Sequence, residues 1–469
     1  MIDPSAAWDT LLADENIPEL CARLADRMRV GRLHFGGRLL CPFLRPFFLD
    51  AADEGRVRHA AETLWILGER IARVAPDNRA LLAQLGLSDA EIRLAAIDPG
   101  YETTSTTARA DAFVLPDSLQ FAEYNGESPA GAGYSQGLAE VFAGEPLMAR
   151  FREQVDAQMY RPVEPLLDAL IASYREWGGT ASPPLIAIVD WDDVPTVSEF
   201  ELLRDAFTAA GVPTIIADPR ELTYSPPVSG SSRTVAGLYA RGQRIDLVYR
   251  RVLINDIVAR PGECRALLDA YEQRAVCVAN SLRCKIPHKK AFFAVLTDER
   301  HAHLFSDSEH RVIRQHVPWT VLIEDGRVAR HGESIDLLEF LRRHRRRFVV
   351  KPNDEYGGTG VVLGWETSEA EWDAALARAV ADHDSRWVAQ EKIAVRREPF
   401  PVCENGALVM RDMLVDFAPY VFRGRLAGFL TRLSASGLAN VTSGGGQVPA
   451  FVIRHGERTV RALTMDRDG

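Results

Sequence analysis

Cysteine is scarce in this chain. Only 6 of its 469 residues are cysteine, and no two of them form a Cys-x-x-Cys pair. So few and so scattered cysteines exclude a disulfide scaffold, and we expect reduced thiols in a cytoplasmic protein. The six are Cys21, Cys41, Cys264, Cys277, Cys284 and Cys403.

Long apolar runs are missing as well. No stretch approaches the roughly eighteen consecutive apolar residues that a membrane span needs. The first twenty residues contain early acids and no basic segment followed by an apolar run, which is unlike a signal peptide. The sequence therefore predicts no membrane partner.

Positive charge is not in excess either. The 55 Lys and Arg face 65 Asp and Glu, for a formal net charge of −10. General nucleic-acid binders carry a broad basic surface, so we expect no nucleic-acid partner and a local group of cations wherever an anion binds. The dense basic run at 342–347 is typical of a helix end, where cations favour the dipole.

What is present is the composition of a globular protein of about three domains, or of one enzyme with subdomains. Apolar positions at helical spacing dominate the first hundred residues. Two alternating runs then flank a turn signal at 115–118. After Pro184, strand-like and helical segments alternate, which is typical of an α/β layer with a parallel sheet.

The alternating runs at 109–125 predict a hairpin with polar side chains on one face. A turn centred on Asp117 places Asp111 opposite Glu123 and Arg109 opposite Asn125. Carboxylates that face each other repel and call for a cation between them, and two carboxylates with an amide oxygen suit Mg²⁺. A solvated strand face is the alternative, and a one-residue register slip would separate the groups.

A second pattern is Lys351 followed by a glycine-rich stretch. Lys351 ends a strand-like run, and Gly357, Gly358 and Gly360 precede another. Glycines let backbone amides approach a phosphate while the lysine supplies a point charge. The order differs from a Walker A loop, in which the lysine follows the glycines. Ordinary turn chemistry is the alternative reading.

These two motifs together resemble the circularly permuted ATP-grasp family, in particular glutathionylspermidine synthase-like carboxylate–amine ligases. FVVKPNDEYGGTGV with WVAQEKI is similar to the nucleotide-gripping half, and R-A-D with the later E-Y-N is similar to the metal-binding segment. The metal segment precedes the glycine-rich loop here, which is the permuted order. The resemblance covers about residues 100 to 450.

The resemblance implies an α/β (α+β) ATP-grasp fold, circularly permuted, with a Rossmann-like subdomain and a helical N-terminal segment. The divisions that we expect are 1–100 (helical N-terminal segment), 101–160 (metal-binding part of the core), 161–280 (Rossmann-like substrate subdomain), 281–400 (nucleotide-gripping subdomain) and 401–469 (C-terminal strands returning to the core).

The resemblance also implies ATP and Mg²⁺ as cofactors and assigns roles to particular residues. The metal ligands would be Asp111, Glu123 and Asn125, and Arg109 would steady an acyl phosphate. Lys351 and Lys290, with Lys289 as the alternative to Lys290, would contact the ATP phosphates. The glycines Gly357, Gly358 and Gly360 would form a mobile lid, and Gln390, Glu391 and Ile393 would line the adenine and ribose pocket.

The implied reaction joins a small-molecule carboxylate to an amine. ATP phosphorylates the carboxylate, and the amine then attacks the acyl phosphate to form an amide or peptide bond. The chain departs from glutathionylspermidine synthases at 126–130, where those enzymes have an acid and threonines, and it lacks an amidase-like domain. Both departures argue against glutathione and spermidine as substrates. The oligomeric state stays open, a homodimer included.

Two further segments are candidates for the same site. Arg251 ends a strand-like run and can bind a substrate carboxylate with a bidentate fork. Arg432 and the loop at 442–446 can face the γ-phosphate or the acceptor. The alternatives are an ordinary exposed arginine and an ordinary turn.

Two readings from other classes remain. The glycines at 131–137 fit a Gly-x-Gly-x-x-x-Gly pattern, which a NAD(P)-dependent oxidoreductase would use as a cofactor loop. A catalytically inactive ATP-binding regulatory protein would keep the nucleotide motifs without ligation. The four histidines between 301 and 316 lack a standard zinc spacing.

Overall fold

The computed structural model describes residues 2–227, 236–435 and 445–454. Their centre is an antiparallel sheet of six strands. Along the sheet the order is β23-β22-β21-β4-β5, and β20 pairs with the outer part of β21. The strands are β4 (Thr107–Val114), β5 (Leu119–Asn125), β20 (Arg396–Glu404), β21 (Ala407–Phe422), β22 (Arg425–Ser434) and β23 (Gly446–Val448).

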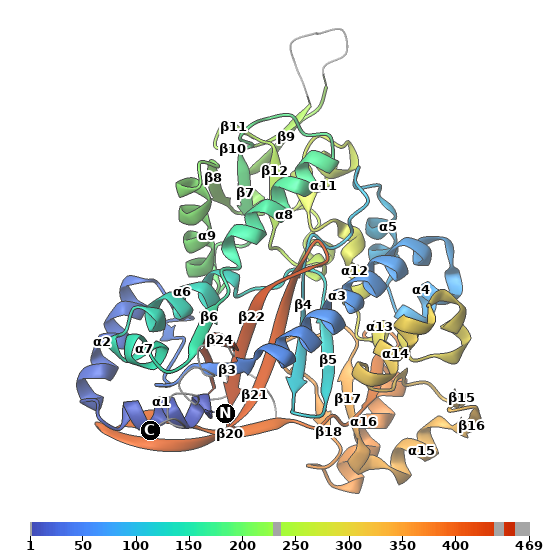
Figure 1. Ribbon diagram of the computed structural model, residues 1–469. Coiled ribbons are helices and arrows are strands. Elements are labelled where there is room, and N and C mark those ends of the chain that lie inside the picture. Colours follow the sequence, from blue (N-terminus) through green and yellow to red (C-terminus); the bar gives the residue numbers. More distant parts are fainter. Residues whose placement is uncertain (1, 228–235, 436–444, 455–469) are drawn as a thin grey trace.

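The permuted chain order is visible in this sheet. The hairpin β4–β5 comes from the first third of the chain, and β20–β23 come from its end. The junction is the pairing of β4 with β21, where Arg109 lies opposite Tyr420. Figure 1 shows the cyan hairpin beside the red strands. Segments about three hundred positions apart therefore form one surface.

A long helix, α3 (Ala51–Val74), crosses one face of the central sheet (Figure 1). The Asp50 side chain caps its start by accepting a hydrogen bond from the Ala52 amide. Val57, Leu64 and Ile71 recur at helical spacing and are almost fully buried. Packing of this apolar stripe against β4, β21 and β22 covers the sheet on the side away from its charged side chains.

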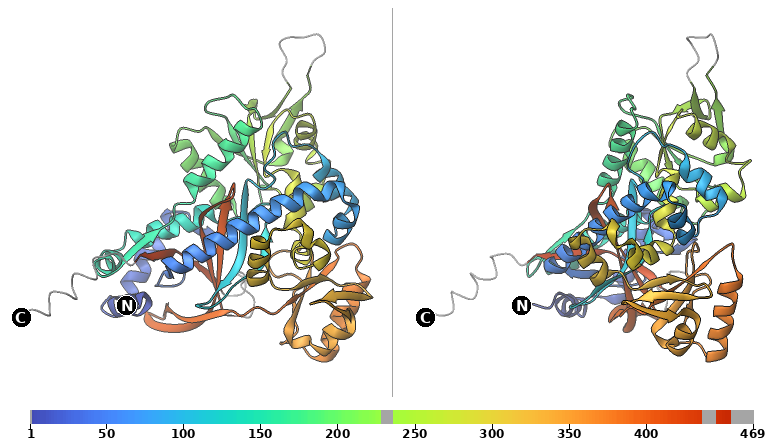
Figure 2. Two further views of the ribbon diagram at one scale, coloured as in Figure 1. Left: turned by 45° about the vertical axis from the view of Figure 1, so that its right-hand side comes forward. Right: turned by 90° about the vertical axis from the view of Figure 1, so that its right-hand side faces the viewer.

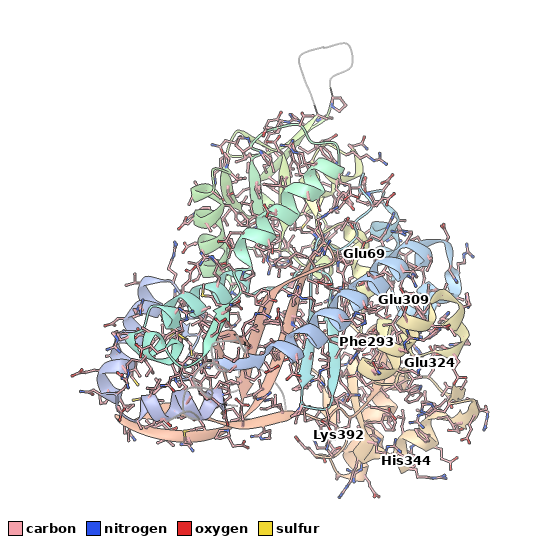
Figure 3. The ribbon with its side chains drawn as sticks, viewed as in Figure 1. Glu69, Phe293, Glu309, Glu324, His344 and Lys392 are labelled. Atoms are coloured by element: carbon pink, nitrogen blue, oxygen red, sulfur yellow. The ribbon has the colours of Figure 1, made fainter. Side chains whose placement is uncertain are left out.

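The same helix fixes the start of β4. Glu69, which lies toward the C-terminal end of α3 (Figure 3), accepts hydrogen bonds from the backbone amides of Thr104 and Ser105 at 2.6 and 2.8 Å. Trp65 donates its indole N–H to the Ser105 carbonyl. Burial raises the pKa of Glu69 to about 7, against the opposing effect of these amides. The helical N-terminus thus braces the strand that carries Arg109.

The rest of the N-terminal segment is mostly helical, as expected, but it also contributes a strand. β3 pairs in parallel with β24, which pairs with β6, so the start and the end of the described chain share a small sheet. The elements are α1 (Pro4–Leu12), α2 (Ile17–Val30), β1 (His34–Phe35), β2 (Arg38–Leu39), β3 (Phe47–Asp50), α4 (Arg79–Leu85), α5 (Asp89–Ala96), β6 (Asp156–Met159) and β24 (Ala450–Arg454).

A parallel sheet of four strands lies beyond one end of the central sheet (Figure 1). Its order is β13-β12-β7-β8, so the chain turns to one side of β7 for β8 and to the other side for β12. The strands are β7 (Ile186–Val189), β8 (Thr214–Ala217), β12 (Leu247–Arg250) and β13 (Cys277–Ala279).

Helices surround these parallel strands, as the alternating pattern after Pro184 predicts, and a small antiparallel sheet that the pattern did not predict lies beside them. The surrounding elements are α8 (Val163–Glu176), α9 (Val197–Ala209), α10 (Ile254–Ala259), α11 (Arg265–Glu272), β9 (Leu222–Ser225), β10 (Gly237–Ala240) and β11 (Gln243–Ile245).

The glycine-rich stretch belongs to a separate small sheet, seen apart from the central sheet in both views of Figure 2. Its order is β14-β19-β17-β18, and it is antiparallel. Ser368 and Glu371 form a capping box that opens α16. The elements are β14 (Thr320–Leu322), β15 (Arg327–Arg330), β16 (Glu333–Asp336), α15 (Leu337–Arg343), β17 (Phe348–Pro352), β18 (Val362–Leu363), α16 (Glu369–Ala381) and β19 (Trp387–Glu391).

A helical connection links the parallel sheet to the small sheet. It contains α12 (Lys285–His288), α13 (Ala291–Leu296) and α14 (Asp307–His316). The chain after β5 forms two helices, α6 (Ala132–Ala143) and α7 (Pro146–Arg152), because Gly144 and Pro146 end one helix and begin the next.

The hairpin register is the one that the sequence predicts at its polar end. Asp111 pairs with Glu123 and Arg109 with Asn125. Nearer the turn the register is shifted by one residue, and a bulge at Ala122 restores it. Without the bulge, alternation would put Phe121 and Glu123 on one face. The bulge lets Phe121 enter the core while Glu123 faces the opposite side.

Candidate active site

Most of the predicted nucleotide and metal residues meet at one cavity of about 350 Å³, whereas Asn125, Lys289 and Gly360 do not line it. Its walls come from the central sheet, the small sheet and the start of α13. Apolar side chains cover the part next to the small sheet, among them Val349, Leu363 and Trp365. Lys392, labelled in Figure 3, lies over the Trp365 ring at 4.4 Å from the centroid. The predicted site residues on the cavity wall are Asp111, Glu123, Lys290, Lys351, Gly357, Gly358, Gln390, Glu391, Ile393 and Arg432.

Asp111 is the most heavily paired carboxylate at this cavity. Arg109 donates Nε to it at 2.8 Å, and the Arg432 guanidinium donates at 2.5 Å. Burial alone would raise the pKa of Asp111, but these two guanidiniums together hold it well below its ordinary range. Asp111 is therefore an anion at any physiological pH, as a cation ligand must be.

Glu123 and Asn125 complete the predicted ligand set. The Asn125 amide nitrogen lies 3.3 Å from Asp111 Oδ1 and 3.2 Å from Glu123 Oε1. The three side chains therefore converge on one point, and a half-turn of the Asn125 amide would present its oxygen there. Two carboxylates and an amide oxygen fit Mg²⁺, which usually takes few protein ligands and completes its shell with phosphate and water.

Other metal arrangements find no support in the described part of the chain. There, no group of three or more His, Cys, Asp or Glu is arranged to hold a metal ion. The clustered histidines have unrelated partners: His301 bonds the Gln84 side chain, whereas His316 bonds the Leu119 carbonyl of β5. The histidines between 301 and 316 thus serve as packing and hydrogen-bonding groups.

Lys351 lies between the two sheets. It donates to the Ala122 carbonyl at 3.2 Å and to Gln390 Oε1 at 2.8 Å. The carbonyl belongs to the bulge of β5, so the lysine of the small sheet contacts the irregular point of the β4–β5 hairpin. Burial lowers the pKa of Lys351 to about 8, although Glu123 opposes the shift.

The structure separates the two candidate lysines at the start of α13. Lys290 lines the cavity, 3.6 Å from Glu123 Oε2, and its ammonium also donates to the Glu355 carbonyl of the glycine-rich stretch. Lys289 points elsewhere: it is buried and pairs with Glu91 at 2.7 Å and with Asp354 at 2.6 Å. Only Lys290 of this pair lies where a phosphate at the cavity could meet it.

The glycine-rich stretch closes one side of the cavity with Gly357 and Gly358. Gly360 lies outside the cavity wall and has a different role. Its φ is +72°, and a Cβ there would come within 2.7 Å of the Pro352 ring. Glycine at position 360 therefore lets the returning chain pass close to the end of β17.

Three residues of β19 and its continuation were predicted to surround adenine and ribose. Gln390 is buried, donates to the Thr320 hydroxyl, and accepts from Lys351. Glu391 pairs with Arg330 at 2.5 Å, and Ile393 adds an apolar surface to the cavity. Their neighbouring apolar wall has the character of a purine pocket.

Arg251 lies outside this cavity, at the carboxyl end of β12. It is buried, donates to the Pro129 carbonyl at 2.8 Å, and its Nε has no hydrogen-bond partner among the described residues. The next carbonyl along the chain, that of Ala130, accepts from Arg109 at 3.0 Å. The segment Pro129–Ala130 therefore links Arg251 to Arg109 of the β4–β5 hairpin.

The glycine pattern at 131–137 does open a helix, but its N-terminus is already filled. Glu199 of α9 accepts hydrogen bonds from the amides of Gly131 and Gly133 at 2.7 and 3.2 Å. A Cβ at Gly131 would come within 2.6 Å of the Tyr420 hydroxyl. The glycine serves a tight contact with β21, and a pyrophosphate would compete with a buried carboxylate for the same amides.

One buried acid at the cavity did not emerge from the sequence. Asp416 lies opposite Arg432 across β21 and β22 and accepts from its Nε at 2.6 Å. Burial raises the pKa of Asp416, while Arg432 lowers it. Arg432 thus bridges Asp416 and Asp111. The available signal was an acid inside the apolar run LVDFAPYVF with an arginine in the partner strand.

Two remaining expectations concern the basic run at 342–347 and the loop at 442–446. The run at 342–347 ends α15 with Arg342 and Arg343 in the last turn, as predicted. Arg345 donates to the carbonyls of Gly364 and Thr367, so it connects the segment before β17 to the segment after β18. Most of the predicted loop at 442–446 lies outside the described residues.

The family comparison agrees with this geometry. A model described as circularly permuted ATP-grasp type 2 matches residues 117–441, which is more than half of the chain. The protein belongs to the circularly permuted ATP-grasp type 2 family.

Individual relatives are distant. A putative glutamate–cysteine ligase of Frankia alni is 25% identical over 225 residues, which cover 46% of this chain and 24% of the relative. An uncharacterized protein of Mycobacterium tuberculosis is 24% identical over 356 residues, 74% of this chain and 58% of the relative. The chain thus spans between about a quarter and three fifths of the length of these curated relatives.

Among solved structures, a glutathione synthetase-like effector from Globodera pallida, in its apo form, has the same fold. The two match with a TM-score of 0.60 at 13% identity, over 96% of this chain and 98% of the other. At this identity the likeness concerns the fold alone. Within the described residues, no helix has the length and apolar character of a membrane span.

Proposed function

We propose that this protein is an ATP-dependent carboxylate–amine ligase that forms an amide or peptide bond through an acyl phosphate and releases ADP. The observation that carries the proposal is the meeting of two charge sets at one cavity. Carboxylates of the central sheet face two lysines from elsewhere in the chain, with Lys290 only 3.6 Å from Glu123. Phosphates held between a divalent cation and lysines explain both sets at once.

Each group has a place in this chemistry. Asp111, Glu123 and Asn125 would hold Mg²⁺, which supplies charge neutralisation on phosphate when bound. Lys290 and Lys351 would bind phosphate oxygens, while Gln390, Glu391 and Ile393 would surround the nucleoside. Arg109 and Arg432, both paired with Asp111, would stabilise the charge that develops as phosphate is transferred and later leaves. No nucleophilic side chain is required.

The carboxylate substrate has a candidate position at the parallel sheet. Ligands of such sheets bind at the carboxyl ends of the strands, where the strand order reverses. That point lies between β7 and β12, next to Arg251, whose Nε is free of partners among the described residues. Arg251 would bind a carboxylate of an amino-acid-like or peptide-like substrate. It lies close to Arg109, because the two arginines donate to the neighbouring carbonyls of Pro129 and Ala130.

The test is a screen of candidate acids against candidate amines that measures ADP release and detects the adduct by mass. We expect ADP and a product that has lost one water relative to its two substrates. A protein that binds Mg·ATP but gives no ADP with any pair would be the regulatory alternative. A thermal shift with NAD(P)H in place of Mg·ATP would instead support the oxidoreductase alternative, against which the filled amides of Gly131 and Gly133 already argue.

A further inference from the structure

Beside the glycine-rich stretch lies a second group of charged side chains, none of which lines the cavity of about 350 Å³. Three acids alternate with three cations, and all but Asp354 are nearly inaccessible to solvent. Every member makes at least one ion pair with another member. We call it the support network: Glu91, Glu127, Asp354, Lys285, Lys289 and Arg250.

Asp354 is the centre of this network. Lys285 donates to its Oδ1 at 2.8 Å, and Lys289 donates to its Oδ2 at 2.6 Å. Lys285 also contacts Glu127 at 3.1 Å, and Lys289 contacts Glu91 at 2.7 Å. Each carboxylate oxygen of Asp354 therefore has its own charge-assisted hydrogen bond, an arrangement that fixes direction as well as distance.

The charges of the support network balance. Arg250 is fully buried and lies 3.4 Å from Glu127, so three positive and three negative groups face one another. His288 lies 3.6 Å from Glu127, and burial lowers its pKa to about 4, which leaves it neutral. A balanced buried cluster is stable while complete and unfavourable when one member is removed.

The support network joins the segments that supply the cavity. Glu127 follows the metal candidate Asn125 by two positions, Asp354 follows Lys351 by three, and Lys289 precedes Lys290 directly. The backbone agrees, because the Lys290 amide donates to the Asn353 carbonyl at 2.9 Å. The Asn353 side chain accepts from the Ala291 amide and donates to the Leu85 carbonyl.

We propose that Asp354 is a positioning residue. Through Lys285 and Lys289 it fixes the start of the glycine-rich stretch against the β4–β5 hairpin, which ends two positions before Glu127. This inference rests on the proposed nucleotide site. Asp354 would touch neither nucleotide nor metal. Together with the contacts of Asn353, it fixes the start of the glycine-rich stretch, so that Lys351 and Lys290 keep their distances from Glu123. The proposal also gives Lys289 a role other than phosphate binding.

The test compares Asp354→Asn with the double variant Asp354→Asn/Lys289→Met. The single variant leaves one cation in excess, whereas the double variant restores two acids against two cations. We expect the single variant to melt at a lower temperature and the double variant to recover most of that loss. Affinity for a non-hydrolysable Mg·ATP analogue should fall about tenfold or more in both, because small misplacements at such sites are costly.

A second measurement, amide hydrogen exchange over residues 355–361 without nucleotide, separates this inference from the proposed function. Exchange there should be faster than in the wild type in both variants. Asp373→Asn, at an exposed position of α16, is the matched control and should change neither the nucleotide affinity nor the exchange. A double variant with wild-type affinity and wild-type exchange would overturn the positioning role. A wild type that binds no nucleotide would refute the proposed function. Hydrogen exchange that is unchanged in both variants would refute the positioning role of Asp354 even then.

Discussion

Two clusters of charged side chains lie close together in the folded protein and differ in what surrounds them. The cavity cluster consists of Asp111, Glu123, Lys290, Lys351 and Arg432, which line a space of about 350 Å³. The support network is paired within itself beside the glycine-rich stretch. Lys289 and Lys290 are neighbours in sequence, yet one belongs to each cluster. Residue type alone therefore does not show which lysine lines the cavity, because that depends on the direction of the side chain.

The largest effect is expected from Asp111→Asn. This change removes an anion from the candidate metal site and leaves Arg109 and Arg432 without their shared partner. ADP release with the substrate pair found by the screen should fall about a thousandfold. Asp117→Asn makes the same chemical change at the exposed turn of the same hairpin and should leave the rate unchanged. Normal turnover in Asp111→Asn would remove this residue from the site.

Lys285→Met should act on stability instead. Lys285 is almost fully buried between Glu127 and Asp354, so its loss leaves two acids without a shared cation. The free energy of unfolding should decrease by about 3–5 kcal/mol. Arg342→Met, which breaks an exposed pair with Asp373, should cost within about 0.5 kcal/mol. Denaturant unfolding of the two variants checks the contrast, and equal costs would contradict it.

Lys290→Met makes the same change five positions later and should have the opposite profile. Its ammonium faces the cavity, and its nearest acid is Glu123 at 3.6 Å. The variant should unfold at close to the wild-type denaturant concentration while its affinity for Mg·ATP falls about tenfold to a hundredfold. Calorimetric titration measures the affinity. A destabilised variant with normal affinity would place Lys290 in the support network.

The smallest effect is a pH dependence of nucleotide affinity. The pKa of Lys351 is about 8 without ligand, and a bound phosphate would raise it. Between the two values the complex holds one more proton than the free protein. Affinity should therefore fall by up to about tenfold per pH unit above pH 8. Lys351→Arg keeps its charge in this range and should show a flat profile. A wild-type affinity independent of pH would contradict the phosphate contact.

The sequence was a good guide where a pattern is local. Strand alternation and one turn signal predict the pairing of Asp111 with Glu123, and the structure has this pairing. Near the turn, however, the pairing of β4 with β5 is shifted by one residue from the predicted register, and the bulge at Ala122 restores it. The local pattern does not predict that bulge, because the bulge lets Phe121 face the core while Glu123 faces the cavity.

The sequence was a poor guide where partners are distant. Glu127, Lys285 and Asp354 come from three segments, and only the fold shows that they meet. The choice between Lys289 and Lys290 depends on the same packing, since adjacent residues at a helix start point in different directions. Asp416 is intermediate, because an acid inside an apolar strand needs a partner, but its pairing with Arg432 requires the register.

If Asp111 and its neighbours hold a divalent cation that in turn binds nucleotide, Mg²⁺ must act on nucleotide affinity through Asp111. Equilibrium titration of ATP with and without Mg²⁺, on the wild type and on Asp111→Asn, tests it most directly. We expect Mg²⁺ to strengthen nucleotide binding to the wild type by about tenfold or more and to have little effect on the variant. An equal gain from Mg²⁺ in both proteins would contradict it.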